Sequence, residues 1–163
     1  MIMPERPALF VVSGGQTGVD RGALDAALEL NSPCGGWCPK GRIAEDGVIS
    51  ERYPVVELQG GYLRRTYKNV EDSDGTLVLT FGKPNGGTAR TIEACQRLHK
   101  PHLVIDAGVT GMSSAEQTVR EFVRGHGITT LNVAGPRASK ESSGYEYARE
   151  LVWRLIRATR HGG

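Results

Sequence analysis

The sequence has 163 residues, of which 39% are hydrophobic and 23% charged, and its formal net charge is +2. This length suits one domain and is too short for two of ordinary size, yet it is sufficient to bury a core without disulfides or a structural metal. The small net charge disfavours a dedicated nucleic-acid binder, and no apolar run approaches the roughly 18 residues that span a bilayer. The odd number of cysteines, three, without a signal-peptide pattern ahead of them, indicates a reducing compartment, and we expect a cytoplasmic protein without membrane contact.

Predicted strands and helices alternate along the chain. Residues 8–12 (ALFVV) form an apolar run that is typical of a strand buried on both faces of a parallel sheet. The loop SGGQTG follows, and then DRGALDAALEL, in which apolar residues recur at helical spacing. Further strands, each followed by a predicted helix, are expected at residues 76–81, 102–106 and 129–133, and the last helix covers residues 144–159.

This alternation predicts a single α/β domain over residues 1–163. Its expected architecture is a Rossmann-like three-layer sandwich with a mostly parallel sheet and helices on both faces. The exception is a loop-rich excursion over residues 34–70, which contains PKGRIAEDG, one short strand at residues 55–58 and the basic segment YLRRT. A long excursion within a compact domain is usually functional, or serves as a lid or an arm for oligomerisation.

Two glycine-rich loops, SGGQTG and NGGT, each stand between a predicted strand and a predicted helix. Open α/β sheets bind their ligands at such positions. Glycine lets backbone N–H groups approach an anion closely, and the N-terminus of the following helix adds partial positive charge. The sequence therefore predicts an anion site such as a phosphate site on these loops, although glycine pairs can also serve only as tight turns. The motifs GxGxxG and GxxxxGK[ST] are absent.

Hydroxyl and cationic side chains near the loops complete the candidate site. Arginine binds phosphate bidentately and lysine as a point charge, whereas the alternative for each cation is a solvated surface position. Arg90 can add charge beside the second loop. The candidate phosphate-binding residues are Gly14, Gly15, Gln16, Thr17, Gly18, Arg21, Lys40, Arg42, Gly86, Gly87, Thr88, Thr91, Arg137 and Lys140.

Glu93 is the candidate catalytic carboxylate, because it follows NGGT by less than two helical turns and lies within reach of a ligand there. A helix-surface charge is the alternative. We expect no metal site, since Cys34 and Cys38 lack a second Cys or His pair at ligand spacing. No Ser-His-Asp or Cys-His arrangement is recognisable in the chain.

Several segments in order resemble the molybdenum carrier family: SGGQTGVDRGALDAAL, CGGWCPKGRIAEDGVI, RTYKNVEDSDGTLVL, NGGTARTIEAC and NVAGPRASK. The resemblance covers nearly all of residues 8–150. It implies a circularly permuted branch of a Rossmann-like superfamily that also contains the LONELY GUY (lysine-decarboxylase-like) phosphoribohydrolases and the DNA-processing Smf (DprA) proteins. It further implies a nucleotide-like ligand or the molybdenum cofactor on the two diglycine loops. Because the chain has no cluster of soft thiolate ligands, such a carrier would hold the organic phosphate part of that cofactor.

The hydrolase relatives carry the motif PGGxGTxxE, and the spacing from Gly87 places Glu93 at its catalytic position. Here Asn85 displaces Pro84 by one residue, and Ala89-Arg90 replaces the Gly-Thr pair of the motif. We therefore expect a binding or carrier protein for a phosphorylated small molecule rather than an enzyme. A nucleoside 5′-monophosphate phosphoribohydrolase is the alternative, and nucleic-acid binding is the least favoured. Relatives of this fold commonly assemble, so we expect a homo-oligomer.

Overall fold

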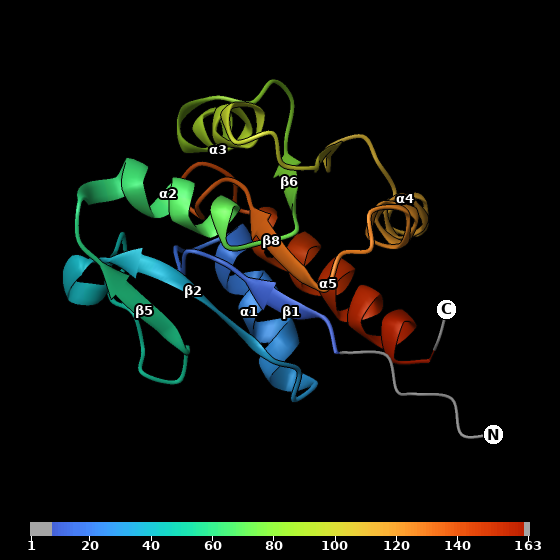
Figure 1. Cartoon of the computed structure of the whole chain (residues 1–163), viewed down its shortest axis with the longest axis horizontal. Coiled ribbons are helices and arrows are strands. Elements are labelled where there is room, and N and C mark those ends of the chain that lie inside the picture. The colour runs from blue at the N-terminus through green and yellow to red at the C-terminus, as the bar shows by residue number, and fades with distance from the viewer. Residues whose placement is uncertain (1–7, 162–163) are drawn as a thin grey trace.

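The computed structural model describes residues 8–161, which fold around a six-stranded sheet with the order β5-β2-β1-β8-β6-β7 (Figure 1). Every neighbouring pair in this sheet is parallel. Its strands are β1 (Phe10–Val12), β2 (Cys34–Pro39), β5 (Val55–Leu58), β6 (Gly75–Thr80), β7 (His102–Asp106) and β8 (Thr130–Ala134). The predicted Rossmann-like α/β fold is confirmed.

Helices cover both faces of the sheet. Figure 1 shows α1 and α5 side by side on one face, whereas α2 and α3 lie on the other. The helices are α1 (Val19–Glu29), α2 (Gly61–Glu71), α3 (Gly86–Arg97), α4 (Met112–Gly125) and α5 (Gly144–Arg160). The central strands are apolar on both sides, and Val11, Leu77 and Leu131 have no exposed surface. Such runs are expected where helices pack on both faces of a parallel sheet.

Residues 34–70 differ from the predicted loop-rich excursion. The strand predicted at residues 55–58 is present as β5. The stretch also contributes β2 and α2 to the main fold, together with an antiparallel hairpin of β3 (Ile43–Ala44) and β4 (Gly47–Val48). The strand β2 was missed because CGGWCP contains two glycines and a proline, which are depleted in strands. The helix α2 was missed because its buried face is largely polar, including Arg65, Thr66 and Asn69, so no apolar stripe marks it.

The strand order reverses between β1 and β8. From β1 the chain passes through α1 to β2 on one side, whereas β6 is followed by β7 on the other side. Ligands of open α/β sheets bind in the crevice at such a point, beyond the carboxyl ends of the strands. Within residues 8–161, no helix combines the length and the apolar character needed to cross a membrane.

Candidate functional site

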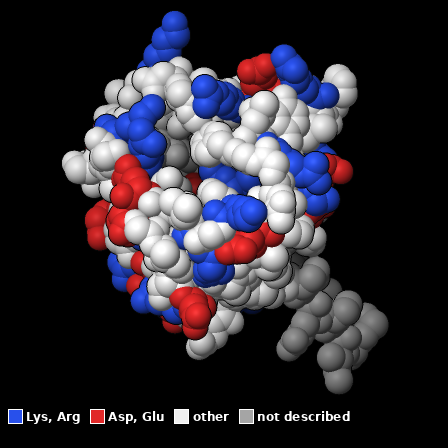
Figure 2. All heavy atoms as spheres, turned by 90° about the vertical axis from the view of Figure 1, so that its left-hand side faces the viewer, with Lys and Arg blue, Asp and Glu red and all other residues white. Residues whose placement is uncertain are grey.

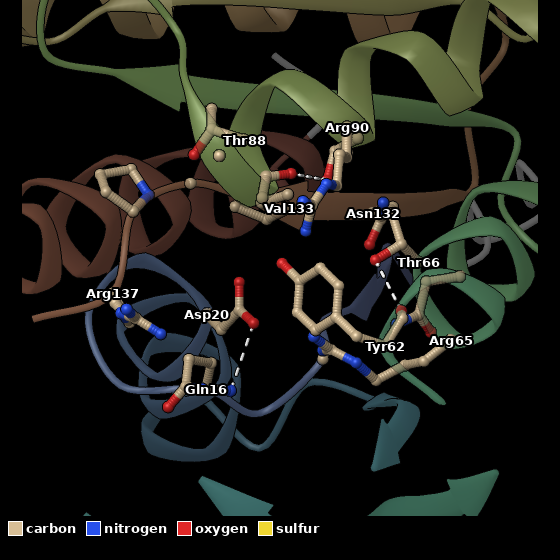
Figure 3. Close-up of a pocket in the computed structure, with 18 of the residues that line it drawn as sticks. Gln16, Asp20, Tyr62, Arg65, Thr66, Thr88, Arg90, Asn132, Val133 and Arg137 are labelled. Carbon is tan, nitrogen blue, oxygen red and sulfur yellow. Dashed lines mark hydrogen bonds between the residues drawn. The ribbon is translucent and has the colours of Figure 1, made fainter. Parts of the chain in front are cut away.

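A cavity of about 360 Å³ lies at the carboxyl ends of β1, β6 and β8 (Figure 3). It is bordered by the β1–α1 loop, by α2, by the first turns of α3, and by the segment that follows β8. Figure 2, which faces the α2 and β5 side of the molecule, shows Lys and Arg side chains around a hollow. The lining residues are Gly14, Gln16, Asp20, Tyr62, Arg65, Thr66, Asn69, Asn85, Gly86, Gly87, Thr88, Arg90, Thr91, Asn132, Val133, Ala134, Gly135, Pro136, Arg137 and Lys140.

The two diglycine loops meet at this cavity although more than 70 positions separate them in the sequence. Eight of the residues selected from the sequence line it: Gly14, Gln16, Gly86, Gly87, Thr88, Thr91, Arg137 and Lys140. The first N–H groups of α3 have no side-chain partner from its N-cap residue, because Asn85 forms no capping hydrogen bond. These groups therefore remain available as donors at the positive end of the helix.

Four other candidates lie beside the cavity without lining it. Gly15 and Gly18 both have φ of +80°, which a glycine adopts without strain. The hydroxyl of Thr17 donates to Glu45 in the β3–β4 hairpin. Arg21 forms an ion pair with Asp46, at 2.8 Å from Nη2 to Oδ1, and its Nε donates to the Gly15 carbonyl oxygen. These residues fix the shape of the loop rather than face the cavity.

Lys40 and Arg42 do not reach the cavity lining either. Lys40 is exposed on a short 3₁₀ turn, Lys40–Arg42. The Arg42 guanidinium donates to four backbone carbonyl oxygens, including those of Ile49 at 3.1 Å and Val55 at 2.6 Å. Its charge is thus used to hold the segment between the hairpin and β5.

Glu93 lies on the solvent side of α3. Its side chain is 52% exposed and pairs with Arg97 one helical turn later, at 2.7 Å from Oε1 to Nη2. It is not among the residues that line the cavity. The spacing from Gly87 to Glu93 matches that of the hydrolase motif, but the helical turn directs the Glu93 side chain away from the loop.

Three glycines of the lining are positions where a polar side chain touches the backbone. A Cβ atom on Gly14 would collide with Nη1 of Arg65, and one on Gly87 would collide with the hydroxyl of Tyr62. At Gly86 a Cβ atom would come within 2.6 Å of Lys140 Nζ. Because these glycines have no side chains, Arg65, Lys140 and Tyr62 can approach the diglycine loops closely.

Arg65 is a buried cation that forms no salt bridge with another described residue. It is 5% exposed, its Nε has no hydrogen-bond partner, and no acidic group within residues 8–161 forms an ion pair with it. The Tyr62 ring lies 4.5 Å from its Cζ and contributes about 0.5–2 kcal/mol of cation–π attraction. Asp20 attracts the guanidinium electrostatically without forming a salt bridge with it. Leaving a buried charge unpaired costs roughly 3–5 kcal/mol, so the ring alone does not offset this cost. The position favours an anion in the cavity.

Asp20 is the one carboxylate of the cavity lining. Figure 3 shows Asp20 and Tyr62 pointing into the same space from α1 and α2. Burial raises the pKa of Asp20 to about 6, although Arg65 and the Gln16 N–H group act in the opposite direction. A carboxyl group at this pKa exchanges a proton close to neutral pH, as groups at functional sites often do.

The β3–β4 hairpin joins two of the segments that form the cavity wall. Glu45 at its tip accepts hydrogen bonds from Thr17 and Ser139, and lies 3.4 Å from Nε of Arg137. The Ser139 and Thr17 hydrogen bonds lower the pKa of Glu45 below its ordinary value. The hairpin therefore holds the β1–α1 loop and the loop after β8 together through an ionised carboxylate.

Sequence reasoning missed the side of the cavity that α2 forms. Arg65 was noted only as part of a basic segment, and Tyr62, Thr66 and Asn69 were not selected, because the helix itself was not predicted. Asn69 fixes α2 on β2 by accepting from the Trp37 N–H group at 2.8 Å and donating to its carbonyl at 3.0 Å. The available signal was the polar residues of YLRRTYKNV at helical spacing, which suit a helix facing a polar cavity.

No metal centre was found among the described residues, since no three His, Cys, Asp or Glu side chains of residues 8–161 are grouped to hold an ion. The cysteines are free and buried, and none lines the cavity.

These features define a Rossmann-like α/β protein with a cationic cavity at the point where its strand order reverses. The chain belongs to the Circularly permutated YpsA SLOG family, whose model matches residues 11–156. It is similar to a crystal structure from Syntrophus aciditrophicus SB that bears the name "Putative molybdenum carrier protein", with 42% identity and a TM-score of 0.88. The match covers 94% of this chain and 99% of that one. No curated protein matches the chain. The family resemblance read from the sequence is confirmed.

Proposed function

We infer that this protein binds a phosphorylated small molecule, nucleotide-like or molybdopterin-like, in the cavity and acts as a binding or carrier protein. The observation that carries this proposal is the buried Arg65 guanidinium, which lines the cavity and forms no salt bridge with the acidic groups of the described residues. The carrier name of the 42% identical protein supports the same role. The cavity volume of about 360 Å³ falls within the range of small-molecule sites.

The charges of the lining favour an anion. The lining contains one carboxylate, Asp20, and four cations from α2, α3 and the segment after β8: Arg65, Arg90, Arg137 and Lys140. Of these, Arg137 also pairs with Glu45 outside the lining. The N-terminus of α3 adds N–H donors and its partial positive charge. A phosphate group next to Arg65 would form bidentate hydrogen bonds and neutralise the buried charge.

The molybdenum cofactor fits this site only through its organic phosphate. The chain's thiols are buried away from the cavity, and burial raises the pKa of Cys34, Cys38 and Cys95, which disfavours the thiolate form that binds metal. The hydrolase alternative rests on Glu93, which pairs with Arg97 outside the lining. A binding role is therefore the better supported of the two.

Titration calorimetry with nucleoside monophosphates and with a pterin phosphate tests the proposal. We expect Arg65→Gln to weaken binding by at least tenfold, because a charged hydrogen bond contributes about 1.5–3 kcal/mol. Arg97→Gln is the matched control, since Arg97 is 69% exposed on α3, and it should bind as the wild type does. Equal affinities in the Arg65→Gln variant and the wild type would contradict the proposal.

A further inference from the structure

Asp20 places a carboxylate inside a cavity that otherwise favours anions. The residue is 8% exposed, and within residues 8–161 its carboxylate accepts one hydrogen bond, from the Gln16 N–H group to Oδ2 at 3.2 Å. An ionised carboxylate can accept about four. The remaining acceptor capacity is directed toward the cavity, where Figure 3 shows the group beside Tyr62.

The Asp20 carboxylate and the Arg65 guanidinium flank the same backbone position. A Cβ atom on Gly14 would lie 3.1 Å from Oδ2 of Asp20 and would collide with Nη1 of Arg65. An anion that binds Arg65 therefore also lies close to the Asp20 carboxylate. The charged and titratable groups that face this space are Arg21, Tyr62, Arg65, Arg90, Arg137 and Lys140. Arg21 and Arg137 are already paired with Asp46 and Glu45, so Arg65, Arg90 and Lys140 attract the anion.

Hydrogen phosphate carries the same charge as sulfate and molybdate, but it differs from them in how it can bind next to a carboxylate. Repulsion between the two is removed when one proton lies between them, as an O–H···O hydrogen bond. The hydrogen phosphate dianion brings this proton with it. Sulfate and molybdate are fully ionised at neutral pH, so the proton must be taken from solvent onto Asp20.

We propose that Asp20 selects the anion of this cavity: an oxyanion is accepted with one proton shared between it and the Asp20 carboxylate, which favours phosphate over sulfate and molybdate. No covalent bond changes, and the hydrogen phosphate complex contains the same proton as its free components. A phosphate monoester above its second pKa of about 6 takes that proton from solvent when it binds. This inference rests on the proposed function and narrows its ligand class to the phosphate oxyanion.

The pH dependence of the wild-type protein is a test that requires no variant. Burial holds the pKa of Asp20 at about 6, so sulfate affinity falls about tenfold per pH unit above that value. Affinity for inorganic phosphate stays constant between about pH 8 and 9, because the dianion supplies the proton. The ratio of the two affinities, measured by titration calorimetry at matched ionic strength, should therefore rise about tenfold over this interval.

Asp20→Asn removes the negative charge and the requirement for a proton. We expect sulfate and phosphate affinities to become nearly equal in this variant and the pH slope for sulfate to disappear. Glu121→Gln changes an exposed carboxylate on α4 and is the matched control. Equal affinities for both anions in the wild type, or a preference for phosphate that persists in Asp20→Asn, would overturn the inference while leaving the anion site intact. Failure of both anions to bind would overturn the proposed function and this inference with it.

Discussion

Asp20 is held in the folded protein at a cost that depends on pH. Burial raises the pKa of its carboxyl from 3.8 to about 6, so the folded state binds the proton more tightly than the unfolded chain does. Stability from this group therefore falls as the pH rises from about 4 to about 6 and stays low above that. The same residue that we propose to select the anion thus destabilises the unliganded fold, as is common at functional sites.

We predict that Asp20→Asn increases the free energy of unfolding near neutral pH by on the order of 3 kcal/mol. The amide keeps the size of the side chain and can still accept from the Gln16 N–H group. Urea denaturation followed by circular dichroism at about pH 7 and about pH 4 measures the difference, which should be small at the lower pH. A variant that is no more stable than the wild type at neutral pH would contradict this account.

Gly14 has no side chain, and this leaves room for the Arg65 guanidinium. Gly14→Ala should displace Nη1 of Arg65 and reduce affinity for phosphate esters about as much as Arg65→Gln does. Gly111→Ala is the matched control, since a Cβ atom there has no neighbour within 4 Å. Calorimetric titration of both variants checks this, and undiminished affinity in Gly14→Ala would show that Arg65 does not bind the ligand from its present position.

At the scale of elements, the contact between α1 and α5 requires a glycine. A Cβ atom on Gly22 would collide with the Tyr145 carbonyl oxygen and lie 3.1 Å from the Arg149 backbone nitrogen, and neither is the flexible end of a side chain. Both helices would have to separate to admit it, and the Asp25 carboxylate that accepts from the hydroxyls of Tyr53 and Tyr145 would be disturbed.

We therefore predict that Gly22→Ala destabilises the protein by about 1–3 kcal/mol, as overpacking of a core usually does. Gly125→Ala at the end of α4 provides the opposite case, because nothing lies within 4 Å of its added Cβ atom. That substitution should increase the free energy of unfolding of the protein by up to about 1 kcal/mol, because alanine has a higher helix propensity than glycine. Thermal unfolding measures the change in Tm, which should be negative for Gly22→Ala and positive for Gly125→Ala. A Gly22→Ala variant as stable as the wild type would show that the two helices can adjust.

The elements also explain what could be predicted from the sequence. Apolar runs identified β1, β6, β7 and β8, and the glycine pairs identified two walls of the cavity. The helix α2, which forms the third wall, was not predicted because Arg65, Thr66 and Asn69 make its buried face polar. A helix that faces a polar cavity lacks the apolar stripe that pattern reasoning needs, so Arg65 became recognisable as a buried cation only in the assembled fold.

At the scale of the whole molecule, the cavity exists only when distant segments assemble. Its cations come from α2, α3 and the segment after β8, which are brought together by the order of strands in the sheet. The β3–β4 hairpin connects two of these walls through the Glu45 carboxylate, whose pKa is lowered by its hydrogen bonds to Ser139 and Thr17. An anion that joins the walls should accordingly stabilise the entire domain and not only the loops it touches.

Ligand binding and the stability of the folded domain are thermodynamically linked. A ligand that binds only the folded state, at a concentration of 100 times its Kd, increases the free energy of unfolding by about 2.7 kcal/mol. For a domain of this size each kcal/mol raises the Tm by roughly 2–4 °C. Phosphate should therefore raise the Tm of the wild-type protein by several degrees over chloride at equal ionic strength. Arg65→Gln should lose most of that increase, whereas Arg97→Gln should keep it, because Arg97 projects from the exposed side of α3. An identical increase in all three proteins would mean that phosphate acts through general salt effects and not through the cavity.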